Sequence, residues 1–209
     1  MLPQLSDLEF FPDLHKYRWR NQWIPYSISR IAQPLSPEDR ANIDLYKDGP
    51  LGWEARGNFV HDAAERRLLG QEPPEDLDCL YQPWLKAIDE CWLLKDCEVL
   101  ATEFCLVDKR GRYAGSFDAL IKTAKGSVSL VDFKSVSSVK SMKTRKPALA
   151  QLGGYASMLL DWAPHITIDK LVTCVIAPGE SRVISSEVND GLMAWGDAWD
   201  TFKLLECPF

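Results

Sequence analysis

The sequence predicts a mixed α/β fold, in which a central sheet of parallel and antiparallel strands is flanked by helices. Three strand-like segments with alternating or β-branched residues follow one another between glycine-containing turns, and helical segments precede and follow them. A further apolar strand comes later, so the order is α-β-β-β-α-β. The 209 residues are enough for one domain with a substantial core, and we expect a single domain over 1–209.

Residues 1–98 are expected to form a helical N-terminal part. Ser36 is a suitable N-cap for a helix at SPEDR, after a first segment rich in aromatic residues and prolines. The segment GWEARGNFVHDAAERRLLG has apolar residues at helical spacing and predicts a helix that ends at Gly70. A third helix is predicted after Pro83, in LYQPWLKAIDECWLLKD.

Residues 99–177 are expected to form the sheet core, which a C-terminal helix follows. Strands are predicted in CEVLATEFCLVD, YAGSFDALIKT, VSLVDFKS and DKLVTCVIAP, with turns at KRGR and AKGS. Before the fourth strand, PALAQLGGYASMLLDW predicts a helix with Pro147 near its N1 position. The closing helix, NDGLMAWGDAWDTFKLLE, has a tryptophan-rich apolar face.

The composition excludes several classes of protein. Its hydrophobic fraction of 46% and charged fraction of 26% are those of an ordinary globular domain, and no apolar run approaches the roughly 18 residues of a membrane span. The N-terminus MLPQLSDLEFF lacks the basic-then-apolar order of a signal peptide, so we expect a soluble, intracellular, cytoplasmic protein. No C-x-x-C pair occurs among the cysteines, which argues against a zinc site. Without a secretion signal, reduced thiols are expected. These cysteines are Cys79, Cys91, Cys97, Cys105, Cys174 and Cys207.

The charge is segregated along the chain. The net charge of −6 argues against nucleic acid as a partner, because basic patches drive backbone binding. Residues 134–146, however, contain five basic residues and no acid, and a second basic cluster, HKYRWR, covers 15–20. Local basic surfaces of this kind can still bind a polyanion.

Two aspartates stand on neighbouring predicted strands. A hairpin would place Asp118 beside Asp132, and two carboxylates this close repel unless one is protonated or a cation lies between them. A hard divalent cation such as Mg²⁺ or Mn²⁺ meets this demand. Lys134 shares a strand face with Asp132, where it could stabilise charge that develops on a phosphate. Taken alone, Asp132 and Lys134 are better explained by an ion pair at the end of a strand.

Further residues favour the metal site over the ion pair. Glu103 lies on the preceding strand, and Gln151 and Tyr155 are four apart on the following helix, hence on one face. His61 and Glu65 share a helix face in the same way. An isolated histidine is more often structural, but the carboxylates downstream favour His61 as a ligand.

The sequence resembles the PD-(D/E)XK nucleases, and within them the RecB-like exonuclease branch. The resemblance is carried by GNFVHDAAE, GSFDAL, VDFKS and QLGGY in that order, with WIPYSISRI before them, over roughly residues 23–176. It implies a restriction-endonuclease-like core. It also implies metal binding by Asp118, Asp132, His61 and the backbone carbonyl of Phe133, with Glu103 supporting the metal site directly or through water. Lys134 would be the catalytic lysine, and Gln151 and Tyr155 would position it or the scissile strand.

No iron–sulfur cluster is expected. Some members of this branch carry one, held by one cysteine before the nuclease core and three closely spaced cysteines after the Q-x-x-x-Y helix. Here only Cys174 and Cys207 follow that helix, and no cysteine precedes His61.

The resemblance therefore implies a Mg²⁺- or Mn²⁺-dependent DNA nuclease, most simply an exonuclease on single strands or ends that leaves 5′-phosphates. Its partners would be DNA and other replication or recombination proteins. A structure-specific endonuclease of the same fold and a non-catalytic nucleic-acid-binding module are the alternatives. A loop with Lys140, Lys143, Arg145 and Lys146 would follow the phosphate backbone.

Among the tryptophans, Trp92, Trp162, Trp195 and Trp199 are expected in the core, and Trp19, Trp23, Trp53 and Trp84 on an exposed stacking surface.

Overall fold

The computed structural model describes residue 2 and residues 4–206, apart from the side chain of Pro37. The expectations that involve Met1 and Cys207 concern positions outside the described residues. In chain order the elements are β1 (Leu8–Phe11), η1 (Pro12–Leu14), β2 (Lys16–Trp19), β3 (Gln22–Trp23), β4 (Tyr26–Ser27), α1 (Ile28–Ala32), α2 (Pro37–Asp44), α3 (Trp53–Leu68), α4 (Gln82–Glu90), η2 (Trp92–Leu94), β5 (Glu98–Val107), β6 (Tyr113–Lys122), β7 (Val128–Ser135), α5 (Val139–Thr144), α6 (Leu149–Trp162), β8 (Lys170–Ala177), β9 (Glu180–Ser186) and α7 (Val188–Glu206).

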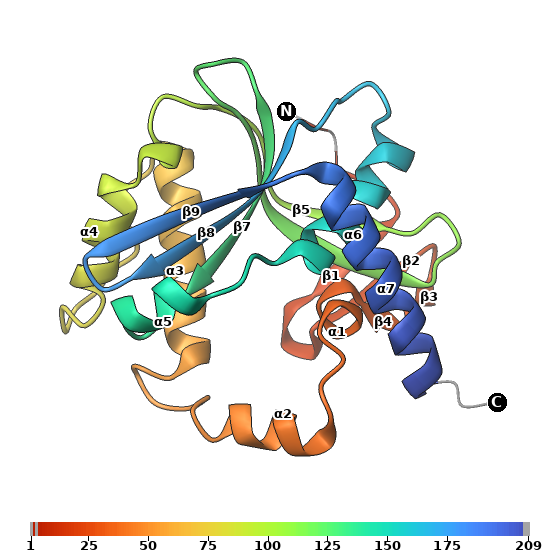
Figure 1. Ribbon diagram of the computed structural model, residues 1–209, viewed down its shortest axis with the longest axis horizontal. Helices are drawn as coiled ribbons and strands as arrows, with labels where there is room; N and C mark the ends of the chain where they lie inside the picture. Colours follow the sequence, from red (N-terminus) through yellow and green to blue (C-terminus); the bar gives the residue numbers. More distant parts are fainter. Residues whose placement is uncertain (1, 3, 207–209) are drawn as a thin grey trace.

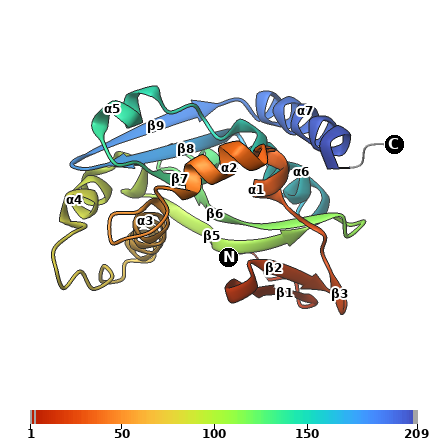
Figure 2. The same cartoon turned by 90° about the horizontal axis from the view of Figure 1, so that it is seen from below.

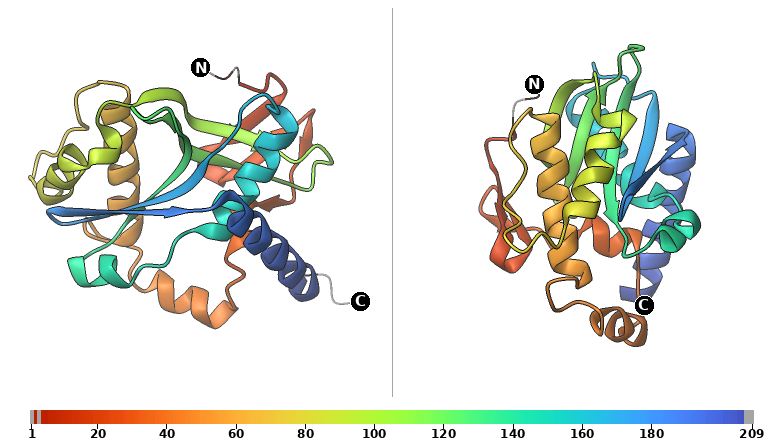
Figure 3. Two further views of the ribbon diagram at one scale, coloured as in Figure 1. Left: turned by 45° about the horizontal axis from the view of Figure 1, so that its top comes forward. Right: turned by 90° about the vertical axis from the view of Figure 1, so that its left-hand side faces the viewer.

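A mixed sheet forms the centre of the described part of the chain. Strands β5, β6, β7, β8 and β9 lie side by side, and β4 also pairs with β6. Strand β7 is parallel to β8 and β4 to β6, whereas the other neighbours are antiparallel. Helices α3 and α4 cover one face and α6 and α7 the other (Figure 1, Figure 3). The predicted mixed sheet with flanking helices is therefore confirmed.

Apolar side chains fill the space on both faces of the sheet. On one face, Val60 and Ala64 of α3 are fully buried in a cluster with residues of β6 and β7. On the other, Leu152 and Leu159 of α6 pack with Trp195 of α7. Among the described residues, no helix is long and apolar enough to cross a membrane.

Residues 1–98 were expected to be helical, but the described part of this region also contains strands. Residues 8–23 form a separate antiparallel sheet, β1–β2–β3, below the main sheet in Figure 2. Alternation places Phe10 and Tyr17 opposite each other on one face, with stacked rings 4.7 Å apart. Arg20 and Asn21 have φ angles of 49° and 63°, the left-handed geometry of a two-residue hairpin turn. The helix at Ser36 is confirmed, because the Ser36 hydroxyl accepts a hydrogen bond from the Asp39 amide at 3.1 Å.

Three further elements differ from the prediction. Strand β9 lies beyond the expected end of the sheet core at residue 177 and pairs antiparallel with β8 after a turn at Gly179, whose φ is 79°. Its side chains are mostly half-buried, so its apolar pattern is weak. The basic segment after β7 contains α5, capped by Ser138, whose hydroxyl accepts from the Ser141 amide at 3.2 Å. Helix α6 begins at Leu149, two residues after Pro147.

Two tryptophans lie elsewhere than expected. Trp84 is buried and donates to the carbonyl of Val136 at 3.0 Å, because it lies on the inner face of α4. Trp92 is 65% exposed, because α4 ends at Glu90 and Trp92 falls in the following turn of η2, out of the helical register.

The turn between β5 and β6 is held by a buried carboxylate. Asp108 accepts hydrogen bonds from Nε and Nη2 of Arg112 at 2.8 and 2.9 Å, and from the Arg110 amide at 3.1 Å. Burial opposes ionisation of Asp108, but Arg112 outweighs it and the pKa of Asp108 is lowered. A lowered folded-state pKa stabilises the fold above the unfolded value of about 3.9 and loses that contribution as the pH falls below it.

We therefore expect Asp108→Asn to lower the free energy of unfolding by about 1–3 kcal/mol at pH 7 and by much less near pH 3. Urea denaturation at the two pH values measures the difference. The exposed Asp96 offers a matched control, since Asp96→Asn should change neither value. An equal loss of stability at both pH values for Asp108→Asn would contradict this role.

Candidate metal centre

The two predicted aspartates lie where strands β6 and β7 separate. The strands pair from Lys122/Val128 to Ala119/Val131, and the next pair in this register would be Asp118/Asp132. Farther along the same edge of β6, β4 pairs with Tyr113 and Ala114. Among the described residues, 115–118 therefore have no strand partner on this edge, and the polar side chains gather in that opening.

Asp118 occupies the point of divergence. Its Oδ2 accepts a hydrogen bond from the Phe133 amide at 2.5 Å, so the side chain takes the place of a strand partner for β7. Its Oδ1 lies 3.5 Å from Nδ1 of His61. Helix α3 positions His61 there, because the buried residues Val60 and Ala64 seat that helix on the sheet.

Glu103 approaches from the other neighbouring strand, β5. The ladder passes from Thr102/Ala119 to Phe104/Phe117 and omits the Glu103/Asp118 pair between them. Glu103 has a φ of 40°, a left-handed conformation that costs a non-glycine residue about 1–3 kcal/mol. Strained backbone of this kind persists where the surroundings enforce it, and it is concentrated at functional sites. Oε2 of Glu103 accepts from the Ser116 hydroxyl at 3.4 Å.

His61, Glu103 and Asp118 form one cluster of ligand atoms, which all lie within 4.8 Å of one another. Burial works against the imidazolium, but Asp118 outweighs it and raises the pKa of His61 to about 9. Burial and the charge of Asp118 raise the pKa of Glu103 to about 7. Asp118 itself has a lowered pKa, because His61 overcomes the effect of its burial. Without a cation, the cluster therefore holds protons that a cation would displace.

Asp132 lies next to this cluster but outside the set of three. Its side chain is 2% exposed, and its Oδ1 accepts from Nζ of Lys134 at 2.7 Å. Nζ of Lys134 also donates to Oε1 of Gln151 at 3.2 Å, so α6 helps to hold the lysine. Burial raises the pKa of Asp132 despite the neighbouring Lys134.

The second oxygen of Asp132 is the least satisfied atom of the site. Oδ2 is buried and has no hydrogen-bond partner among the described residues. Leaving such an oxygen unpaired costs free energy that a bound cation or a proton would recover. The two carboxylates and one imidazole of the cluster fit a hard divalent cation, so His61, Glu103 and Asp118 could hold a metal ion.

Tyr155 packs against strand β6 next to the site. It is buried, with its ring 6.2 Å from that of Phe117, so it is not free to contact a substrate. A Cβ on Gly115 would lie 2.9 and 3.0 Å from Cε1 and the hydroxyl of Tyr155, which shows how closely the tyrosine packs under the unpaired edge. Tyr155 lies one turn after Gln151 on α6. That it positions Lys134 through Gln151 stays a prediction.

The remaining predicted site residues are Phe133 and the basic residues that follow β7. Phe133 has a buried side chain and its amide serves Asp118, whereas metal binding by its carbonyl stays a prediction. The four basic residues Lys140, Lys143, Arg145 and Lys146 are exposed on and just after α5. In the described part of the chain, no hydrogen bond or ion pair joins their side chains to the cluster.

Sequence reasoning missed Tyr17 and Ser116. Tyr17 is a buried residue of β2, and its pKa is raised by burial and by the nearby charges of Cys105 and Glu103. The β1–β3 sheet thus places a phenol near Glu103. The alternation of Leu8 and Phe10 with the facing Tyr17 and Trp19 was the signal that could have revealed this sheet.

No protein-family model matches the chain, and no curated protein matches it significantly. Among solved structures, the chain is similar to an alkaline exonuclease, LHK-Exo from Laribacter hongkongensis, at 12% identity and a TM-score of 0.39, over 86% of this chain and 90% of that one. It is also similar to the protein SSO0001, at 12% identity and a TM-score of 0.32, over 68% of this chain and 73% of that one. Both TM-scores are below 0.5, so neither similarity indicates a function for this chain.

Proposed function

We propose that the chain is a metal-dependent nuclease that hydrolyses phosphodiester bonds in DNA, and that it acts as an exonuclease on single strands or ends. The observation that carries this proposal is the buried Oδ2 of Asp132, which has no hydrogen-bond partner in the part of the chain that the structure describes, next to Lys134 and the cluster of His61, Glu103 and Asp118. A purely structural ion pair would use both carboxylate oxygens or expose one of them to water.

Each side chain of the site has a separate proposed role. His61, Glu103 and Asp118 would hold a Mg²⁺ or Mn²⁺ ion, and Asp132 lies next to these three residues. When bound, such an ion acts as a Lewis acid that stabilises negative charge on a phosphoryl oxygen. Lys134 is held by Asp132 and Gln151 and is 19% exposed, so its ammonium group can still donate to a phosphate oxygen as charge develops there.

The substrate path is proposed to continue over α5. Residue Lys134 is followed closely by the exposed Lys140, Lys143, Arg145 and Lys146, which form a local basic surface on an acidic protein. Phosphate contacts of this kind bind the backbone without reading its sequence. DNA is therefore the proposed partner of this surface.

Digestion of end-labelled single-stranded oligonucleotides, with each end blocked in turn, tests the function. We expect nucleotides with 5′-phosphates to be released in Mg²⁺ or Mn²⁺ and none in EDTA. Blocking one end should stop the release, and a circular single strand should remain intact. Cleavage of the circle would instead indicate an endonuclease. Tight DNA binding without cleavage in either metal would indicate a non-catalytic module.

A further inference from the structure

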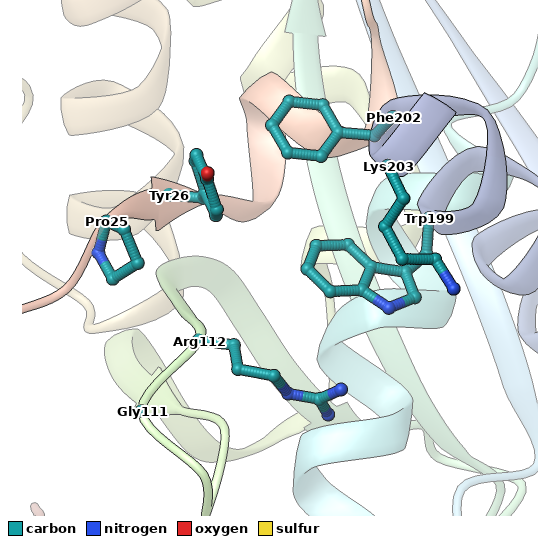
Figure 4. A pocket seen from close by; sticks show the side chains of 7 residues that line it. All are labelled: Pro25, Tyr26, Gly111, Arg112, Trp199, Phe202 and Lys203. Atoms are coloured by element: carbon teal, nitrogen blue, oxygen red, sulfur yellow. The ribbon is translucent and has the colours of Figure 1, made fainter. Parts of the chain in front are cut away.

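A cavity of about 320 Å³ opens beside the start of strand β6. Its walls come from three separate segments: β4, the turn before β6, and the last turns of α7. Figure 4 shows the rings of Tyr26 and Trp199 on opposite sides of this cavity, with Phe202 at one end and Arg112 at the other.

The walls of the cavity are aromatic and held in place by packing. Phe202 is buried, with its ring 4.9 Å from that of Tyr26, edge to face, and 5.9 Å from that of Trp199. Trp199 also contacts the ring of Tyr113 at 5.2 Å. Fixed aromatic walls with an opening to solvent favour a planar, unsaturated ring as the ligand.

Cations stand at the rim of the cavity. The guanidinium of Arg112 lies 5.5 Å from the Trp199 ring, and Nζ of Lys203 lies 6.0 Å from it. Asp108 binds Arg112 through two of the five guanidinium N–H groups, which fixes the cation and leaves the others available. Lys203 pairs with Asp200 at 2.7 Å, but both are exposed, and an exposed pair of this kind is easily exchanged.

The aromatic walls and the cations at the rim together indicate the class of ligand. A planar ring that carries an anionic group beside it is the chemistry of a nucleotide. A duplex keeps its bases stacked inside the helix, so only an unpaired base can enter a cavity of this size. The neighbouring turn adds Lys109 and Arg110, both exposed, to the positive charge around the opening.

The cavity and Asp118 of the metal centre lie along strand β6, on the edge that β4 and β7 share. Strand β5 occupies one edge of β6, so β4 and β7 both lie on the other. Tyr26 pairs with Tyr113, and Asp118 is five residues farther along β6, a separation of about 17 Å at ~3.3 Å per residue. A few nucleotides of single strand span this separation.

We propose that this cavity binds one unpaired nucleotide of the strand that the metal centre would cleave, with the base between Tyr26 and Trp199 and the phosphate on Arg112 and Lys203. The inference rests on the proposed nuclease function for the identity of the strand. It adds a second contact that selects single-stranded DNA or frayed ends over intact duplex.

Two measurements in EDTA, where no cleavage is expected, test the cavity. First, an oligothymidylate that contains 5-iodouracil is cross-linked to the protein by light, and the linked residues are mapped by mass spectrometry. We expect Tyr26 or Trp199 among them. Second, fluorescence anisotropy follows binding of a labelled oligothymidylate as the salt concentration is raised. For Lys203→Ala we expect binding to weaken about threefold or more, and the slope of log K against log salt to fall by about 0.7.

Lys86→Ala is the matched control, because Lys86 is also an exposed lysine that pairs with a carboxylate on its own helix, Glu90. It should change neither the affinity nor the slope. Cross-links confined to other residues, no detectable binding, or a Lys203→Ala slope equal to that of the wild type would overturn the inference, even if the protein degrades single strands in Mn²⁺. Cross-links at Tyr26 or Trp199 without any cleavage in metal would leave the cavity as a nucleotide site and remove the proposed nuclease function.

Discussion

In metal-free buffer, the Asp132→Asn variant is expected to melt a few degrees higher than the wild-type protein, and it should release nucleotides far more slowly when Mg²⁺ or Mn²⁺ is added. Asp132 is nearly fully buried, and one of its oxygens has no partner among the described residues. Burial raises its pKa, so the fold favours the neutral form, and the charge at pH 7 costs stability. A neutral amide of the same shape removes that cost.

The size of each effect follows from the same contacts. A gain of about 1 kcal/mol corresponds to about 2–4 °C in a chain of this length. Activity should fall by at least about 10²-fold, because Lys134 loses the carboxylate that orients it and the site loses a negatively charged oxygen. The wild type should be stabilised by Mg²⁺ or Mn²⁺, by about 2.7 kcal/mol at 100 times the dissociation constant, and the variant much less.

Differential scanning fluorimetry with and without metal, beside the nucleotide-release assay, measures both quantities. Asp89→Asn is the control, since Asp89 is 72% exposed and pairs only loosely with Arg67 at 3.7 Å. It should change neither activity nor melting temperature. A variant Asp132→Asn that stays active, or that melts several degrees lower without metal, would contradict the role given to Asp132.

Two glycine-to-alanine substitutions should have opposite effects on stability. Helices α6 and α7 meet at Gly153 and Gly191, where a Cβ on Gly153 would lie 1.9 Å from the carbonyl oxygen of Gly191. Backbone cannot yield as a flexible side chain can, so Gly153→Ala should force the helices apart. We expect a loss of about 3 kcal/mol or more in the free energy of unfolding.

Gly196 offers the matched control on α7. It is exposed, and nothing lies within 4 Å of the Cβ that it would gain. Because alanine favours a helix over glycine, Gly196→Ala should stabilise the protein by up to about 1 kcal/mol. Urea denaturation followed by circular dichroism measures both variants. Similar midpoints for the two would show that the helices do not meet in backbone contact at Gly153.

The Gly153→Ala substitution should also reduce activity where the protein still folds. Gln151 lies two residues before Gly153 on α6 and holds Lys134 at 3.2 Å. A shift of α6 would therefore move the lysine relative to Asp132. The position of α6 therefore affects both the stability of the fold and the proposed catalysis.

The strand that carries Asp132 and Lys134 could be predicted from sequence to the residue, as Val128–Ser135. Its apolar run is bounded by a glycine turn and a polar segment, and both faces are covered, so local pattern and burial agree. The N-terminal sheet could not be predicted in the same way. Its strands have two to four residues each, too few for alternation to stand out among prolines and aromatic residues.

The sequence by itself determined the mixed α/β fold and the strands that carry Asp118, Asp132 and Lys134, because periodicity and turn residues are local properties of the chain. Only the tertiary structure decided which side chains meet. The left-handed backbone at Glu103 and the separation of β6 from β7 bring Glu103 and His61 to Asp118, and leave Asp132 beside them with one unpaired oxygen. These contacts depend on where a ladder breaks and how a helix is seated, and both are decided by the packing of segments far apart in sequence.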